Sequence, residues 1–128
     1  MKVLALDYGA ARTGVAVSDA SGTIARPLGV VERASTPDGI DELKAMVREQ
    51  EVGCVVVGMP LTLRGEHGAQ AVETTAFVER LRDVVDVPVE TLDERFTTAI
   101  AARAGGASDE DARAAAHLLE SYLRSIEG

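Results

Sequence analysis

Acidic side chains occur at three places that a folded chain could bring together. Asp7 follows one apolar run, the pair Asp93 and Glu94 follows another, and Asp111 lies near the start of a C-terminal helical pattern. A carboxylate at the end of a buried strand is costly unless something compensates its charge, and neighbouring carboxylates repel one another. A divalent metal ion relieves that repulsion, and Mg²⁺ keeps coordination positions for water and a phosphate group. These residue types therefore point to metal-dependent hydrolysis of a phosphodiester bond.

Each acidic position also has a purely structural interpretation. Asp7 can be a turn residue next to Gly9, and Ser108 with Asp111 fits a capping box at a helix start. Glu94 can form a surface ion pair with a neighbouring arginine. The combination of all three at one predicted edge of a sheet favours a site over these separate interpretations.

Residues that bind phosphate follow the same predicted strands. The guanidinium group makes bidentate contacts to phosphate, and a threonine at a helix start can contact phosphate through its hydroxyl and the backbone. The candidates for a phosphate-contacting rim are Arg12, Arg64, Arg95 and Thr97. Scattered surface arginines and an ordinary helix cap are the alternative interpretation.

The elements that must position these groups are predicted from periodicity. Apolar runs predict five strands, with a proline in the third that indicates an edge strand or an irregularity: Val3–Leu6, Gly14–Ser18, Ile24–Val31, Val52–Val57 and Val87–Leu92. Helices are predicted from Thr36-Pro37, through Phe77 and Leu81, from Thr97 or Thr98, and from Ser108 along an apolar face that reaches Ile126.

This order predicts an α/β fold with a mixed five-stranded sheet flanked by helices. The first three strands form an antiparallel meander, and crossover helices make the fourth and fifth parallel to the first. The carboxyl ends of those three strands then share the edge where α/β proteins place ligands.

Composition limits the function classes. A chain of 128 residues predicts one domain, residues 1–128. With 13 Lys and Arg against 21 Asp and Glu, the net charge of −8 argues against a diffuse basic coat for nucleic acid and leaves room for a local patch. The one cysteine, Cys54, is expected to be a small buried residue and indicates a reducing cytoplasm. No apolar stretch approaches the ~18 residues of a membrane span.

Four blocks together resemble one known family. The segments Leu4–Gly9 with Arg12–Asp19, Val57–Leu61, Leu92–Thr98, and Asp111–Leu123 are similar, in this order, to the YqgF (RuvX) family. Its members are bacterial proteins described as candidate Holliday junction resolvases or pre-16S ribosomal RNA nucleases. The resemblance covers nearly the whole chain.

The resemblance implies a ribonuclease H-like fold and a metal-dependent phosphodiesterase. Its metal ligands would be Asp7, Glu94 and Asp111, with Asp93 as the alternative to Glu94, holding two Mg²⁺ or Mn²⁺ ions that Asp7 bridges. Implied partners are nucleic acid, either precursor 16S ribosomal RNA trimmed at its 5′ end or structured DNA in recombination, together with ribosomal particles. A monomer or weak homodimer is expected.

Two other functions remain as alternatives. Asp7-Tyr8-Gly9 followed by Thr13–Val17 also resembles the first phosphate loop of actin-like ATPases. Those proteins place two such domains around a nucleotide, and this chain supplies one. A catalytically silent RNA-binding module is the second alternative.

Overall fold

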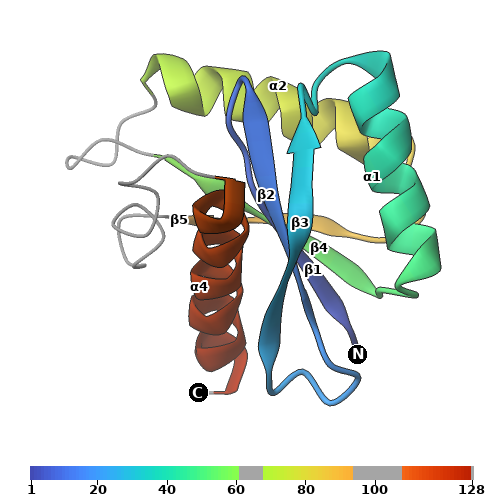
Figure 1. Cartoon of the computed structure of the whole chain (residues 1–128), viewed down its shortest axis with the longest axis vertical. Coiled ribbons are helices and arrows are strands. Elements are labelled where there is room, and N and C mark those ends of the chain that lie inside the picture. Colours follow the sequence, from blue (N-terminus) through green and yellow to red (C-terminus); the bar gives the residue numbers. More distant parts are fainter. Residues whose placement is uncertain (61–67, 94–107, 128) are drawn as a thin grey trace.

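A five-stranded sheet in the order β3-β2-β1-β4-β5 organises the chain (Figure 1). The computed structural model describes residues 1–60, 68–93 and 108–127. The strands are β1 (Val3–Asp7), β2 (Arg12–Ser18), β3 (Ala25–Glu32), β4 (Cys54–Met59) and β5 (Val89–Asp93). Strands β1, β2 and β3 form the predicted antiparallel meander, and β4 and β5 run parallel to β1, which confirms the prediction. The carboxyl ends of β1, β4 and β5 therefore share one edge.

In the part of the chain that the structure describes, three helices flank the sheet: α1 (Pro37–Glu49), α2 (Ala69–Arg82) and α4 (Ser108–Glu127). Helix α1 begins as predicted, because the Thr36 hydroxyl accepts a hydrogen bond of 3.2 Å from the Gly39 amide and Pro37 occupies the first turn. Helix α4 begins at the predicted Ser108. The short helix predicted from Thr97 or Thr98 lies outside the described residues.

The two faces of the sheet carry separate cores. Alternation along β1 sends Leu4 and Leu6 to the face covered by α1 and α2, where they meet Phe77 of α2. Val3 and Ala5 point to the opposite face, which α4 covers. The core under α4 is rich in small side chains, which lets the helix lie close to the strands: Ala5, Ala16, Ala114, Ala115 and Ala116. Figure 1 shows α4 on one side of the sheet and α1 and α2 on the other.

Pro27 marks an irregular edge strand, as predicted. Strand β3 is the outermost strand on its side of the sheet, and its pairing with β2 shifts register between Val15 and Ala16. Proline has no amide hydrogen to donate, so it is tolerated at an edge or next to a bulge. The prediction offered an edge strand or an irregularity, and β3 has both.

The start of β4 and the last turn of α4 differ from the prediction. Strand β4 begins at Cys54 and not at Val52, because Cys54 is the residue that pairs with Val3, the first residue of β1. The predicted apolar face of the last helix is wrong at Ile126, which is 60% exposed. Ile126 lies in the last turn of α4, where Arg124 and Ser125 are exposed as well. None of the helices in the described ranges is long and apolar enough to cross a membrane.

We expect Leu81→Ala to lower the free energy of unfolding by about 2–5 kcal/mol, because it leaves a cavity beneath α2. Leu81 is fully buried there, whereas Val72 on the same helix is 60% exposed. Val72→Ala is the matched control and should change stability by less than about 0.5 kcal/mol. Urea denaturation measures both, and equal effects would show that α2 does not pack as described.

Candidate active site at the carboxyl edge of the sheet

Asp7 lies at the carboxyl end of the central strand β1. Asp7 is buried, with 3% of its surface exposed to solvent. Alternation from Val3 and Ala5 places the Asp7 side chain on the face that α4 covers. The loop that follows is closed by the Thr13 hydroxyl, which lies 3.4 Å from both the amide nitrogen and the carbonyl oxygen of Gly9. A buried strand and a closed loop thus hold this carboxylate in place.

Gly14 of β2 allows the start of α4 to lie next to Asp7. It pairs with Asp7 across the antiparallel ladder, which puts their Cα atoms about 4.5–5.5 Å apart. A β-carbon at Gly14 would overlap the backbone carbonyl of Asp111 and would lie 3.1 Å from the Ala112 amide nitrogen. The first turns of α4 therefore rest directly on β2 beside Asp7. The structure thereby brings together two of the three predicted carboxylates, and Asp111 is 9% exposed.

Arg12 forms an ion pair with Asp111. Its Nε lies 2.9 Å from Asp111 Oδ2, although the approach does not have hydrogen-bond geometry. The Arg12 side chain is 40% exposed and that of Asp111 is 12% exposed. A cation at this position offsets the repulsion between Asp111 and Asp7. Its partial exposure also leaves the guanidinium within reach of a phosphate group from solvent.

Glu110 adds a carboxylate that the sequence analysis missed. Its Oε2 is buried and accepts no hydrogen bond from the residues that the structure describes, while its Oε1 lies 3.9 Å from Arg113 Nη2. A buried carboxylate oxygen without a hydrogen-bond partner costs free energy, which a bound cation would remove. An acid directly before Asp111 in the first turns of the helix was the sequence signal.

The remaining predicted residues follow β4 or β5. Glu94, Arg95, Thr97 and Arg64 lie outside the described residues. Asp93 is described: it pairs with Met59 at the end of β5. Leu92 packs against the core under α4, so alternation places Asp93 on the opposite face, away from the side of Asp7.

No three His, Cys, Asp or Glu side chains gather closely enough to hold a metal ion within residues 1–60, 68–93 and 108–127. The predicted ligand set includes Glu94, which is not in those ranges. Among the described residues, Asp7, Glu110 and Asp111 supply the type of oxygen donor that Mg²⁺ and Mn²⁺ bind. The donor chemistry at this edge therefore fits a divalent ion.

Cys54 is buried as predicted and also has polar partners. Its Sγ donates to Glu90 Oε2 at 3.1 Å, and the Tyr122 hydroxyl donates to the same oxygen at 2.6 Å. Burial, with the hydrogen bond to Glu90, raises the pKa of the Cys54 thiol to about 11. The Tyr122 hydrogen bond lowers the pKa of Glu90. The cluster ties α4 to β4 and β5 and leaves the thiol a poor nucleophile.

Comparison with known proteins gives a match to one family over nearly the whole chain. The sequence profile of the RuvX family, described as Holliday junction resolvase, matches residues 1–125. The chain belongs to the RuvX family. It is a nuclease, a hydrolase of phosphodiester bonds, which agrees with the carboxylates at the edge of the sheet.

Curated relatives share much of the chain. A protein of Thermoanaerobacter pseudethanolicus, named as a candidate pre-16S rRNA nuclease, is 39% identical over 103 residues, covering 80% of this chain and 74% of that protein. A protein of Chloroflexus aggregans with the same name is 44% identical over 99 residues, covering 77% and 70%. One from Nocardia farcinica, again with that name, is 46% identical over 109 residues, covering 79% and 60%.

Solved structures show the same fold at low identity. RuvC of Thermus thermophilus in complex with a Holliday junction substrate has a TM-score of 0.59 at 18% identity, covering 100% of this chain and 96% of that chain. The fowlpox virus resolvase in complex with Holliday junction DNA has a TM-score of 0.63 at 10% identity, covering 100% of both. The predicted ribonuclease H-like fold is confirmed.

We expect Gly14→Ala to reduce nuclease activity sharply, because the added methyl group pushes the first turns of α4 away from β2 and moves Asp111 from Asp7. The clash is with backbone atoms, so its cost exceeds the ~1–3 kcal/mol that is typical of overpacked side chains, and circular dichroism must first show that the variant is folded. Gly29→Ala on neighbouring β3 is the matched control, because nothing lies within 4 Å of the added atom. Circular dichroism and cleavage rates test both variants, and full activity in Gly14→Ala would contradict the arrangement.

We expect iodoacetamide at pH 8 to alkylate Cys54 more than about 100 times more slowly than an unperturbed cysteine peptide. The pKa of about 11 lies above that pH, so almost all of the thiol is protonated, and the rate should rise as the pH approaches 11. Mass spectrometry measures the reaction. Unfolding in urea should restore the ordinary rate, and rapid alkylation of the folded protein would contradict the buried cluster.

Proposed function

We propose that this chain is a divalent-metal-dependent endonuclease that processes the 5′ end of precursor 16S ribosomal RNA. The observation that carries the proposal is the placement of Asp111 beside Asp7 by the contact of α4 with Gly14. The substrate is inferred from the relatives of 38–46% identity, which are named for pre-16S rRNA.

The proposed metal ligands are Asp7, Asp111 and Glu94, with Mg²⁺ or Mn²⁺ as the ions. Asp93 is the less suitable alternative, because it lies on the face of the sheet opposite Asp7. Glu110 Oε2 supports the presence of a cation near the first turns of α4. Two bound divalent ions would supply an activated water and would stabilise the leaving oxygen of the phosphodiester.

The protein's own groups have separate tasks in this proposal. Strand β1 holds the Asp7 carboxylate rigidly, and Gly14 sets the distance to Asp111. Arg12 orients the Asp111 carboxylate and, from its exposed side, contacts a phosphate of the substrate. Arg64, Arg95 and Thr97 are proposed as further phosphate contacts. Local cations therefore bind the nucleic acid although the whole chain carries a charge of −8.

A four-way DNA junction is the second candidate substrate. The family description and the similarity in fold to junction resolvases favour it. The two substrates differ in the 2′-hydroxyl and in overall shape, which are the properties that a nuclease reads to separate RNA from DNA.

We expect Asp7→Asn to lower the cleavage rate by about 100-fold or more, because it removes one negative charge from the carboxylates that would hold the metal ions. Wild type and variant are tested on precursor 16S RNA, a four-way DNA junction and single-stranded oligonucleotides, each with Mg²⁺, Mn²⁺ or EDTA. Asp41→Asn, an exposed residue of α1, is the matched control and should cleave normally. Calorimetry of Mn²⁺ binding gives a readout that is independent of turnover.

Metal-dependent cleavage of the RNA alone would support the ribosomal role, and cleavage of the junction alone would replace it with DNA processing. Comparison of Glu94→Gln with Asp93→Asn assigns the third ligand: we expect the larger loss of Mn²⁺ affinity in Glu94→Gln. Wild-type cleavage and metal binding by Asp7→Asn would overturn the proposed site.

A further inference from the structure

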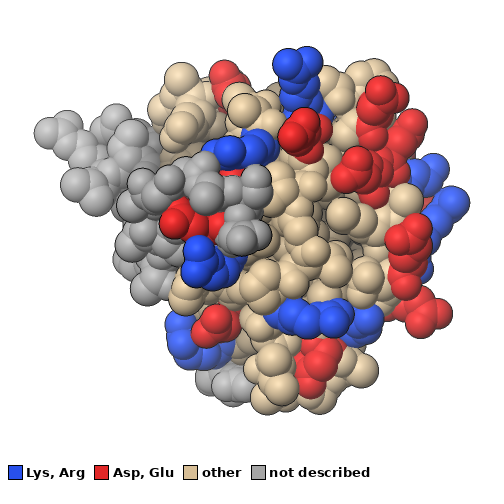
Figure 2. All heavy atoms as spheres, viewed as in Figure 1, with Lys and Arg blue, Asp and Glu red and all other residues tan. Residues whose placement is uncertain are grey.

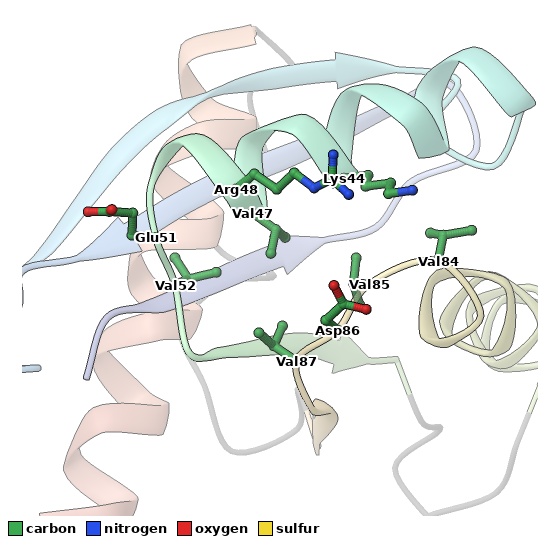
Figure 3. Close-up of a pocket in the computed structure, with 9 residues that line it drawn as sticks. All are labelled: Lys44, Val47, Arg48, Glu51, Val52, Val84, Val85, Asp86 and Val87. Carbon is green, nitrogen blue, oxygen red and sulfur yellow. The ribbon is translucent and has the colours of Figure 1, made fainter.

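A groove of about 230 Å³ lies between the C-terminal half of α1 and the segment that joins α2 to β5 (Figure 3). Val52 and Val87 line it, and each lies two residues before the first residue of a strand, β4 and β5 respectively. Asp7 is at the other end of the sheet, since β1 and β4 are parallel. Six-residue β4 spans about 20 Å, so the groove is separate from the proposed active site.

The floor of the groove is apolar. Five valines form it: Val47, Val52, Val84, Val85 and Val87. Val47 and Val52 are buried, whereas the other three remain partly exposed. Covering these methyl groups would be favourable in proportion to the area removed from water. The volume is below the range of about 300–1,000 Å³ for sites that hold drug-sized ligands, and it suits a single apolar side chain.

Opposite charges face each other across this floor. Lys44 and Arg48 extend from one side, one helical turn apart on α1, and Asp86 comes from the other side (Figure 3). Within the described residues, no ion pair or side-chain hydrogen bond joins any of the three to another group. Like charges four residues apart on a helix repel, so an anion between Lys44 and Arg48 would be stabilising. Glu51, the other acid of the rim, points away from the valines.

We propose that this groove docks a peptide segment of a partner protein in which an apolar side chain of leucine size precedes an acidic residue. The apolar side chain would cover the valines, and the acidic side chain would bind Lys44 and Arg48. Asp86 would accept a hydrogen bond from a backbone amide of the segment. A cationic wall facing an anionic wall matches a peptide, because a peptide carries both a carboxylate acceptor and amide donors.

The probe is the blocked tetrapeptide acetyl-Ala-Leu-Glu-Ala-amide, titrated into the full chain with its valine methyl groups labelled for NMR. We expect shifts at Val85 and Val87 and saturable binding. The tetrapeptide with Gln in place of Glu should bind about tenfold more weakly, because it loses the charge-assisted contact. Acetyl-leucine, a free small carboxylate, should also bind more weakly than the tetrapeptide.

The variant Lys44→Gln/Arg48→Gln should reduce affinity for the Glu peptide to that for the Gln peptide. Arg26→Gln/Arg124→Gln, which removes the same charge from exposed positions on β3 and α4, should bind as wild type does. Nuclease activity should be unchanged in both. Absent shifts at the groove, or equal affinity for the two peptides, would overturn the proposal. Acetyl-leucine that binds as tightly as the tetrapeptide would indicate a small-molecule site and would also overturn it.

Discussion

The first turns of α4 lie so close to β2 that only a residue without a β-carbon fits at Gly14. This contact has a chemical consequence, because Gly14 is the ladder partner of Asp7. A helix seated on that glycine places its own acidic residue, Asp111, beside the carboxylate of the central strand. Arg12 then offsets part of the repulsion between two acids that the packing forces together. The proposed active site therefore depends on the close contact between α4 and β2 at Gly14.

The two faces of the sheet are packed with side chains of different size. Large aliphatic and aromatic side chains fill the layer beneath α1 and α2, whereas many alanines fill the layer beneath α4. Small side chains let α4 approach the strands closely, which is what the contact at Gly14 requires. On the face seen in Figure 2, acids and bases are interspersed around a central area of uncharged residues. Nucleic acid is therefore expected to bind through local cations near the edge and not through a basic face.

The two ends of the sheet also differ. Asp7 and Asp111 lie where β1 ends, and an apolar groove with unlike charges on its walls lies where β4 and β5 begin. Similarity in fold to junction resolvases, at 10–18% identity, describes the scaffold that both ends share. The chemistry at each end depends on this chain's own side chains. A partner bound at the groove would leave the catalytic edge open to a substrate.

Local patterns in the sequence determined most elements and the positions of the carboxylates. Alternating or continuous apolar runs predicted five strands, Thr36-Pro37 predicted the start of α1, and Pro27 predicted an edge strand or an irregularity, because each signal acts within a few residues. The parallel strand order placed Asp7 at a shared edge, while the roles of Glu94, Arg64, Arg95 and Thr97 stay predictions. Tertiary structure alone decided the ion pair of Arg12 with Asp111, the close approach at Gly14, the exposure of Ile126 and the Cys54–Glu90–Tyr122 cluster. The contacts join residues far apart in the chain, and the exposure of Ile126 depends on what packs against the end of α4. Periodicity carries no information about either.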